Sequence, residues 1–484
     1  MKKFKILHRF LTFLFASLIL FFSVAYVKAD GEDDYEALSE ARKNLPIQSN
    51  SIQGWPEGPQ VSAEAAILID AKSGTILYAK NIDERLFPAS TTKILTCVLA
   101  LENSELDDTV TFSYDAVHAV PWDGSKIGMD AGQTLTMEEC LQAILIGSAN
   151  EVSNAVAEHV GGSMDGFVDM MNARVNELGL TNTHFVNANG LFDENHYTSA
   201  YDLSMIAREF FSYEMLAKIA RTPKVEFYPT ATQPDEITVN SKNLLYEGKK
   251  YHYEYLVGSK TGYTDMARQT LVSCAKKDGM ELICVVLKEE SPYQFTDTIT
   301  LFEYGFNNFS LVNVKDIEDN FNPDNSDFFN TGTDIFGNST ELLKVNEDAK
   351  LILPNEADLT NLKMNLVYET DNQNAVAKVL YTYNGAEVGY SDIMLNSLST
   401  DFFESIYVED DAPITNVDGK SVFINVKIVL IVIVCIVILI TIILLAYTQI
   451  KAYRRKKRAE ARKKKNKDKD RYYKSSSKRH NFKV

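Results

Sequence analysis

Residues 65–80 read AAILIDAKSGTILYAK, in which two apolar runs flank the turn-forming stretch Asp70-Ala71-Lys72-Ser73-Gly74. Short apolar runs on either side of such a stretch predict a β-hairpin. Far along the chain, residues 269–275 and 281–287 are another pair of apolar runs, around Lys276-Lys277-Asp278-Gly279. Asp-Gly between two such runs is a strong hairpin signal. The sequence therefore predicts strands at two places that are distant in the chain.

Between the two hairpins the pattern is helical. Thr136 is a candidate N-cap, because Glu139 stands three residues later and completes a capping box. Gly179 is a typical helix stop. The predicted helices of this stretch are, in order, one from Pro88 to Leu101, one after Thr136, one from Met164 to Leu178 and one starting at Ser199. A further helix, opened by Ser291-Pro292, is predicted after the second hairpin. Residues 63–309 are therefore predicted to form an α/β (α+β) domain. Its antiparallel sheet is closed by the two ends of the segment, flanked by helices and interrupted by a helical insert.

The rest of the chain divides by composition. Residues 343–405 alternate apolar and polar side chains around Asn384-Gly385, which predicts a second, small all-β domain. In chain order the predicted segments are a signal peptide at 1–29, a polar stalk at 30–62, the α+β domain at 63–309, a linker at 310–342, the small β domain at 343–405, an acidic stalk at 406–426, a transmembrane helix at 427–447 and a basic cytoplasmic tail at 448–484. The small β domain and the stalks contain no cluster of reactive side chains, so we expect them to be spacers.

Two uncharged apolar segments predict where in the cell the protein lies. Residues 10–27 follow several basic residues and precede Val27-Lys28-Ala29, as in a secretory signal, with an uncleaved anchor as the alternative. Residues 428–447 would span about 30 Å as a helix, which matches the hydrocarbon core of a bilayer. Lysines and arginines follow at once and mark the cytoplasmic side. We expect a single-pass protein of the cell membrane with residues 30–426 on its outer side. The basic tail could attract anionic lipid, or serve only as a stop-transfer signal.

Charge and composition exclude several functions. The formal net charge of −17 divides into +5 for residues 1–29, −36 for residues 30–450 and +14 for residues 451–484. So acidic a body argues against nucleic acid as a partner, because phosphate affinity comes from Lys and Arg. The cysteines and histidines have no metal-ligand spacing, so no metal and no cofactor are expected. The sequence establishes neither a disulfide nor a protein partner.

Three short motifs could carry chemistry. Ser90 and Lys93 stand three residues apart at the start of a predicted helix, where a lysine with a lowered pKa can accept a serine proton. Ser148 and Asn150 lie on a predicted loop and could face one cleft. Lys260-Thr261-Gly262 lies on a predicted strand, where a cation beside a hydroxyl suits a carboxylate and the glycine leaves room for a ligand backbone. Each motif alone often occurs by chance. The occurrence of all three in this order is what indicates a function.

Together the motifs resemble the S-x-x-K, S-x-N and K-T-G set of penicillin-binding proteins and serine β-lactamases. Residues 63–309, about half of the chain, are similar to the low-molecular-mass penicillin-binding proteins, the serine-type D-alanyl-D-alanine carboxypeptidases. The small β domain resembles the second domain of that family more loosely. The stretches that carry the resemblance are IDAKSG at 69–74, PASTTK at 88–93, HYTSAYDL at 196–203 and GSKTGYT at 258–264.

The resemblance implies a fold, a reaction and a set of roles. The enzyme would remove the terminal D-alanine from peptidoglycan stem peptides through an acyl-enzyme, and β-lactams would inhibit it covalently. The implied roles are Ser90 as nucleophile, Lys93 as general base, Ser148 as proton relay, Asn150 as orienter of the substrate amide, Lys260 and Thr261 as holders of the terminal carboxylate, and the backbone N–H groups of Ser90 and Tyr263 as the oxyanion hole. Family members often end in an amphipathic anchor helix, whereas this chain has a predicted transmembrane span.

Two other functions stay open at this point. A membrane-anchored serine β-lactamase of class A would need a deacylating glutamate, and no convincing candidate follows Asn150. A non-enzymatic β-lactam sensor would need a cytoplasmic output domain, and the basic tail is too short and too polar to fold into one. Release of D-alanine from a D-Ala-D-Ala peptide, measured beside hydrolysis of nitrocefin, separates these possibilities.

Overall fold

The computed structural model describes residues 35–317 and 343–395, except 347, 369, 371 and 373. The predicted signal peptide, most of the linker, the acidic stalk, the predicted transmembrane helix and the basic tail lie outside these residues. Within the described part of the chain, no helix is both long enough and apolar enough to cross a membrane.

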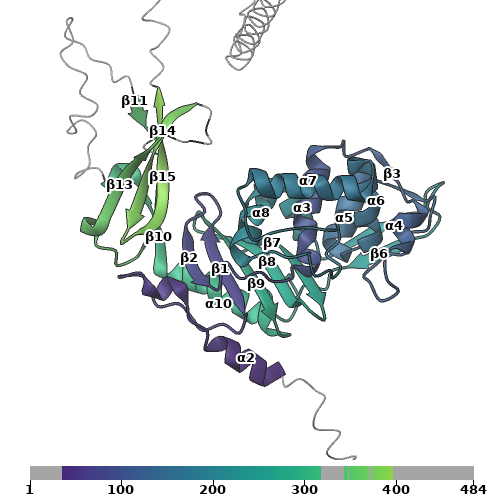
Figure 1. The fold of residues 1–484 in the computed structure, drawn as a ribbon, viewed down its shortest axis with the longest axis horizontal. Helices are drawn as coiled ribbons and strands as arrows, with labels where there is room; N and C mark the ends of the chain where they lie inside the picture. Colours follow the sequence, from purple (N-terminus) through teal and green to yellow (C-terminus); the bar gives the residue numbers. More distant parts are fainter. Residues whose placement is uncertain are drawn as a thin grey trace, which may run out of the picture. The chain divides into compact units, whose positions relative to one another are not determined.

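The central sheet has five strands, all paired antiparallel, in the order β2-β1-β9-β8-β7 (Figure 1). The strands are β1 (Ala65–Asp70), β2 (Ile76–Lys80), β7 (Leu256–Thr264), β8 (Arg268–Lys277) and β9 (Met280–Glu289). β1 pairs with β9, so the two ends of the domain meet in the middle of the sheet. This confirms the predicted sheet closed by distant hairpins. It also leaves β7, which carries Lys260-Thr261-Gly262, at an edge.

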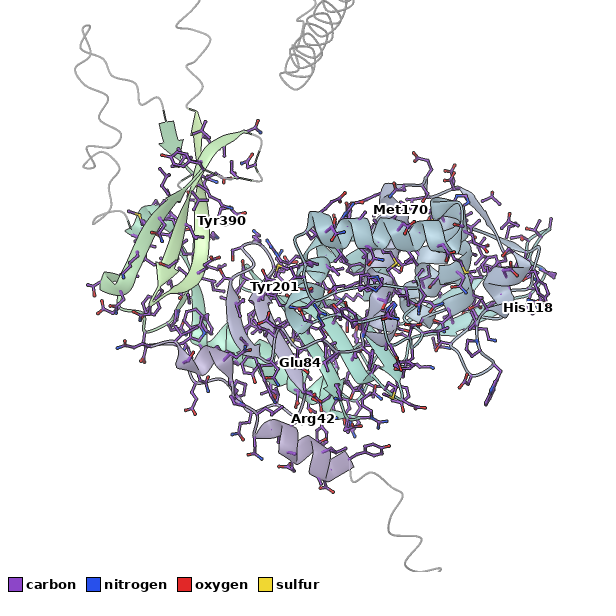
Figure 2. The ribbon with its side chains drawn as sticks, in the orientation of Figure 1. Arg42, Glu84, His118, Met170, Tyr201 and Tyr390 are labelled. Carbon is purple, nitrogen blue, oxygen red and sulfur yellow. The ribbon has the colours of Figure 1, made fainter. Side chains whose placement is uncertain are left out.

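Helices and short strands fill the insert between β2 and β7. They are η2 (Ala89–Thr92), α3 (Lys93–Glu102), β3 (Thr109–Thr111), α4 (Tyr114–His118), β4 (Thr134–Thr136), α5 (Met137–Gly147), α6 (Asn150–Gly161), α7 (Met164–Glu177), α8 (Ala200–Ser212), α9 (Glu214–Ala220), β5 (Lys224–Phe227) and β6 (Ile237–Asn240). Packed side chains fill the space between their ribbons, as around Met170 of α7 (Figure 2). A further helix, α10 (Tyr293–Asn308), follows the last strand of the sheet.

The sheet is buried on both faces. Alternate side chains of a strand point to opposite faces, and the strand β1 shows the result. Ile67 and Ile69 pack into the core of the helical insert, whereas Ala66 and Leu68 pack into a second core with Phe302 of α10. Two helical layers therefore enclose the sheet, which holds the motif-bearing strand β7 against the insert.

Several local predictions are confirmed. Thr136 and Glu139 form the capping box of α5 with both reciprocal hydrogen bonds, and the Ser199 side chain caps α8. The predicted helix at 88–101 differs at its start, because residues 89–92 form a 3-10 turn and the α-helix begins only at Lys93. The four described cysteines, which are Cys97, Cys140, Cys274 and Cys284, are free and buried.

The segment before the sheet differs from the predicted polar stalk at 30–62. It contains α2 (Tyr35–Lys43) and the 3-10 turn η1 (Gln48–Ser51). Trp55 is buried and its indole Nε1 donates to the Leu77 carbonyl oxygen over 2.8 Å. Lys80 is fully buried and donates to the carbonyl oxygens of Arg42 and Val61. These contacts bind the segment to the outer strand β2.

The second sheet has the order β11-β15-β14-β13 and contains the predicted turn at Asn384-Gly385. Its strands are β11 (Leu343–Val345), β13 (Leu362–Val367), β14 (Ala375–Tyr383) and β15 (Ala386–Leu395). One strand of the expected small domain, β12 (Lys350–Pro354), pairs instead with β10 (Phe309–Asn313), which follows α10 and precedes α11 (Val314–Ile317). Trp55, Phe309, Leu351 and Tyr383 belong to one apolar core. The small β domain is thus not a separate spacer, because it shares a core with the segment before β1.

Because the two domains share this core, we expect the small β domain to stabilise the α+β domain. A chain that ends at Asn308 lacks Phe309, whose ring centroid lies 5.1 Å from that of Trp55. Removing a buried phenylalanine costs about 3–5 kcal/mol. We expect the midpoint of thermal unfolding to fall by about 10 °C or more, as followed by circular dichroism. A chain that ends at Asn355 keeps β10 and β12 and is the matched control. Equal midpoints for the Asn308 chain and the full ectodomain would restore the spacer interpretation.

Candidate active site

Ser90 lies on the 3-10 turn η2, directly before α3. The preceding residue, Ala89, has a φ of 49°, which a residue with a side chain adopts only when its surroundings hold it. Gly190 packs so closely on Ala89 that any Cβ at position 190 would collide with the Ala89 carbonyl oxygen. This close packing helps to hold Ala89 in its conformation. From the sheet side, the Thr270 hydroxyl donates to the Pro88 carbonyl oxygen over 2.9 Å. The serine is therefore fixed between a loop of the insert and strand β8.

Lys93 is fully buried beneath Ser90, and its Nζ lies 3.0 Å from Ser90 Oγ. Nζ also contacts Asn150 Oδ1 at 2.6 Å and the Asn189 carbonyl oxygen. Burial, and next the charge of Lys260, hold the pKa of Lys93 well below its usual range. A neutral amine has two N–H groups and one lone pair. Two partners are oxygens that accept and the third is a hydroxyl that can donate, so the arrangement suits a neutral Lys93 that accepts the Ser90 proton.

Ser148 and Asn150 lie at the junction of α5 and α6. Ser148 is the C-cap of α5 with a φ of 58°, and Asn150 is the first residue of α6. The Asn150 side chain reaches Lys93, whereas Ser148 Oγ lies 3.0 Å from Lys260 Nζ. Asn150 thus contacts Lys93, and Ser148 contacts Lys260. The motif therefore lies between the lysines of the other two motifs.

Lys260 reaches the same cleft from the edge strand β7. Its Nζ donates to Ser148 Oγ over 3.0 Å and to the Thr261 carbonyl oxygen over 2.8 Å. The residue is almost completely buried, and burial lowers the pKa of its ammonium group to about 7. An anion bound beside Nζ would favour the charged form and raise this pKa.

Gly262 has a steric role within the fold. A Cβ at this position would lie 2.8 Å from Ser90 N and would collide with Thr270 Oγ1. The missing side chain therefore lets β7 approach the serine turn, and the room that it leaves for a ligand backbone stays a prediction. The approach brings the backbone of Gly262 close to the backbone N–H of Ser90.

The predicted site residues that contact one another are Ser90, Lys93, Ser148, Asn150, Lys260, Thr261 and Gly262. The Tyr263 side chain instead contacts Asp265. The structure also adds residues that sequence reasoning missed. The carbonyl oxygen of Asn189 contacts Lys93, and His196 contacts the Thr92 hydroxyl at 2.8 Å. Glu151 follows Asn150 and is fully buried, but its Oε1 accepts from the backbone N–H groups of Ile127 and Gly128. Its role is to hold that loop, so it supplies no general base beside Ser90.

Comparison with known proteins agrees with this geometry. Residues 53–291 match the sequence profile described as D-alanyl-D-alanine carboxypeptidase. The D-alanyl-D-alanine carboxypeptidase DacF of Bacillus subtilis is 37% identical over 253 residues, which cover 51% of this chain and 63% of that protein. DacB2 of Mycobacterium tuberculosis, of the same description, is 31% identical over 52% of this chain and 84% of that protein.

Solved structures show the same fold. Penicillin-binding protein 5 from Haemophilus influenzae superposes with a TM-score of 0.53 at 25% identity, covering 70% of this chain and 98% of that one. Penicillin-binding protein 6B from Escherichia coli superposes with a TM-score of 0.52 over 72% of this chain and 99% of that one; at 24% identity it supports the fold alone. This chain belongs to the D-alanyl-D-alanine carboxypeptidase family of serine peptidases.

Proposed function

We propose that this protein is a serine D,D-carboxypeptidase that removes the terminal D-alanine from peptidoglycan stem pentapeptides in cell-wall synthesis and remodelling. The observation that carries the proposal is the environment of Lys93. A fully buried lysine whose other two partners are oxygen acceptors, 3.0 Å from Ser90 Oγ, fits a general base for an acyl-enzyme reaction. The family named above supports the choice of substrate.

In the first step Lys93 Nζ takes the Ser90 proton, and Ser90 Oγ attacks the carbonyl carbon between the last two D-alanines. The negative charge on the carbonyl oxygen would be stabilised by the backbone N–H groups of Ser90 and Tyr263. The close approach of Gly262 to Ser90 N supports this pairing, because Tyr263 is the next residue of the strand. The turn that fixes Ser90 keeps the nucleophile in place before the substrate arrives, which lowers the entropic part of the barrier.

Breakdown of the tetrahedral intermediate needs a proton for the leaving nitrogen. We propose that Ser148 relays to this nitrogen the proton that Lys93 took from Ser90, which leaves Lys93 neutral again; the Ser148 hydroxyl lies 3.0 Å from Lys260 Nζ, where the leaving group would be held. D-Alanine then leaves and Ser90 carries the acyl group. In the second half of the cycle Lys93 takes a proton from water, the water attacks the ester, and Ser90 Oγ is released with its proton restored.

Substrate binding would use the polar groups of the site that are not bound to the general base Lys93. Lys260 and Thr261 would hold the terminal carboxylate through a charge-assisted hydrogen bond and a hydroxyl. Asn150 Oδ1 is already bound to Lys93, so its amide nitrogen is the group that remains to orient the substrate amide. β-Lactams would acylate Ser90 by the same steps.

We also propose that the protein is held in the cell membrane by the predicted span at 427–447, with the catalytic domain on the cell-wall side and the tail at 448–484 in the cytoplasm. The support is the sequence alone: an uncharged stretch of membrane length followed by a basic segment. The predicted signal peptide at 1–29 would direct export of the domain.

The test is the release of D-alanine from a soluble D-Ala-D-Ala pentapeptide, measured beside nitrocefin hydrolysis with the same ectodomain. We expect the enzyme to hydrolyse the peptide over many turnovers. With nitrocefin we expect rapid acylation by about one equivalent per enzyme, followed by slow hydrolysis of the acyl-enzyme. Sustained nitrocefin hydrolysis without release of D-alanine would instead indicate a β-lactamase. Stoichiometric labelling by both β-lactam and peptide, without turnover of either, would indicate a sensor.

A further inference from the structure

The positions of the catalytic groups set the direction in which a bound peptide runs, given the proposed function. The terminal carboxylate would lie at Lys260 and Thr261, and the scissile carbonyl would lie at Ser90, which faces Gly262. β7 runs from Leu256 to Thr264 and has a free edge. The part of the peptide upstream of the scissile bond must therefore extend past Tyr263 toward the connection between β7 and β8.

This end of the cleft has an unusual rim, made by Tyr263, Asp265 and Met266. The Tyr263 side chain is 49% exposed and that of Met266 is 52% exposed. Asp265 is also exposed, and the Tyr263 hydroxyl donates to its Oδ1 over 3.0 Å. The rim therefore offers apolar surface with a single carboxylate, held in place by a tyrosine that is itself part of the edge strand.

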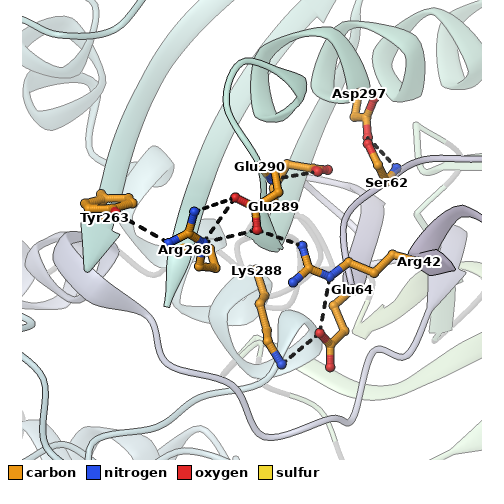
Figure 3. A network of polar contacts seen from close by, with 9 residues as sticks. All are labelled: Arg42, Ser62, Glu64, Tyr263, Arg268, Lys288, Glu289, Glu290 and Asp297. Atoms are coloured by element: carbon orange, nitrogen blue, oxygen red, sulfur yellow. Dashed lines mark hydrogen bonds and ion pairs between the residues drawn. The ribbon is translucent and has the colours of Figure 1, made fainter. Parts of the chain in front are cut away.

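Helix α2 supplies a further wall, and it precedes the residues that match the family profile. Figure 3 shows the ion pairs that hold it: Arg42 of α2 contacts Glu290 at 3.2 Å, and Glu290 also binds Arg268. The Arg268 guanidinium lies 4.2 Å from the ring centroid of Tyr35 and 5.7 Å from that of Tyr263. Tyr35, 42% exposed, is thereby placed beside the rim.

The charge that remains available on the rim is that of Asp265. The Arg268 guanidinium binds Glu290 by contacts of 3.1, 3.1 and 2.7 Å, and Arg42 shares the same carboxylate. Among the described residues, no lysine or arginine forms an ion pair with Asp265. A carboxylate without a cation, beside exposed apolar side chains, suits a ligand with an aliphatic stem and a positively charged end.

We propose that Tyr35, Tyr263, Asp265 and Met266 form a subsite for the side chain of the stem-peptide residue that precedes D-Ala-D-Ala, and that the subsite selects a side chain with methylene groups and a terminal ammonium. The methylenes would pack on the tyrosine and methionine side chains, and the ammonium would pair with Asp265. This inference deepens the proposed function and rests on it.

The test compares two soluble peptides, acetyl-L-lysyl-D-Ala-D-Ala and its Nε-acetyl-lysyl counterpart, which lacks the side-chain charge and carries one additional acetyl group. We expect kcat/KM to be about threefold to fivefold higher for the charged peptide, as is typical of one exposed ion pair. In Asp265→Asn the ratio should fall to about 1. Because the pair is exposed, rising salt should reduce the wild-type ratio as well.

Asp278→Asn is the matched control, since it removes the same charge from an exposed turn of the same sheet, in the β8–β9 hairpin. Its ratio should equal that of the unmodified protein. Penicillin labelling of Asp265→Asn reports whether the variant is folded. A ratio that is the same with and without Asp265 overturns the subsite, while hydrolysis of both peptides keeps the proposed function. Hydrolysis of neither peptide would remove both proposals.

Discussion

Replacing Ser90 by alanine is expected to abolish both covalent labelling by penicillin and the release of D-alanine. No other hydroxyl has the same contact with Lys93 Nζ among the described residues, so no second nucleophile can take over. Knocking out the nucleophile of a serine peptidase leaves only the residual effect of substrate binding, and the loss in kcat is about 10⁶-fold in a comparable case. Labelling is read by fluorescent penicillin on a denaturing gel and by the mass of the acyl-enzyme.

Ser310→Ala is the control for this variant, because Ser310 is an exposed serine on β10, remote from η2 in the chain. It should label and turn over like the unmodified protein. Circular dichroism should give Ser90→Ala an unchanged melting curve. Acylation that persists in Ser90→Ala would place the nucleophile elsewhere.

Lys93→Arg and Lys260→Arg are expected to differ sharply, although both changes keep a cation. Arginine stays charged in proteins and cannot accept the serine proton. Lys93→Arg should therefore lose acylation by about 10²–10⁴-fold, the usual contribution of a general base. Lys260→Arg keeps the charge that would face the carboxylate, so it should retain activity and mainly raise KM. The rate of penicillin acylation and the steady-state constants with the pentapeptide separate these outcomes.

The pH dependence of kcat/KM gives a further test of the role of Lys260. Burial lowers the pKa of Lys260 to about 7 in the free protein, so its charged fraction falls as the pH rises through 7. Since the charged form would bind the carboxylate, kcat/KM should decline on the alkaline side of about 7, a limb that reports the free enzyme. Lys260→Arg should remove this limb. If the limb is identical in Lys260→Arg, or if Lys93→Arg acylates at the normal rate, the two lysines do not have the proposed roles.

The local structure around the three motifs could largely be predicted, because each motif has a recognisable sequence pattern. Ser90 lies on the 3-10 turn before α3, Lys93 begins that helix, Ser148 caps α5, and Lys260 lies on an edge strand. By contrast, Asn189 reaches Lys93 through its carbonyl oxygen. A backbone acceptor has no side-chain signature, so no pattern in the sequence could have indicated it.

The two differences in the fold have a common physical cause. Apolar periodicity shows that a segment is a strand or a helix, but not which partner covers it. The strand β12 fits the alternation of the small β domain, yet it pairs with β10. Similarly, the polar, proline-containing segment before β1 looked like a free stalk, although its Trp55 is buried and its carbonyl oxygens at Arg42 and Val61 bind Lys80 of β2.

The pairing of β1 with β9 also bears on how the enzyme matures. Strands from the two ends of the domain must meet before the sheet exists, and such long-range pairing makes folding slow. Before the domain folds, Lys93 is exposed to water, and in water a lysine is protonated at neutral pH. Ser90 would therefore stay unreactive until the domain has folded. Acquisition of penicillin reactivity by a refolding chain would thus report the moment at which the sheet closes.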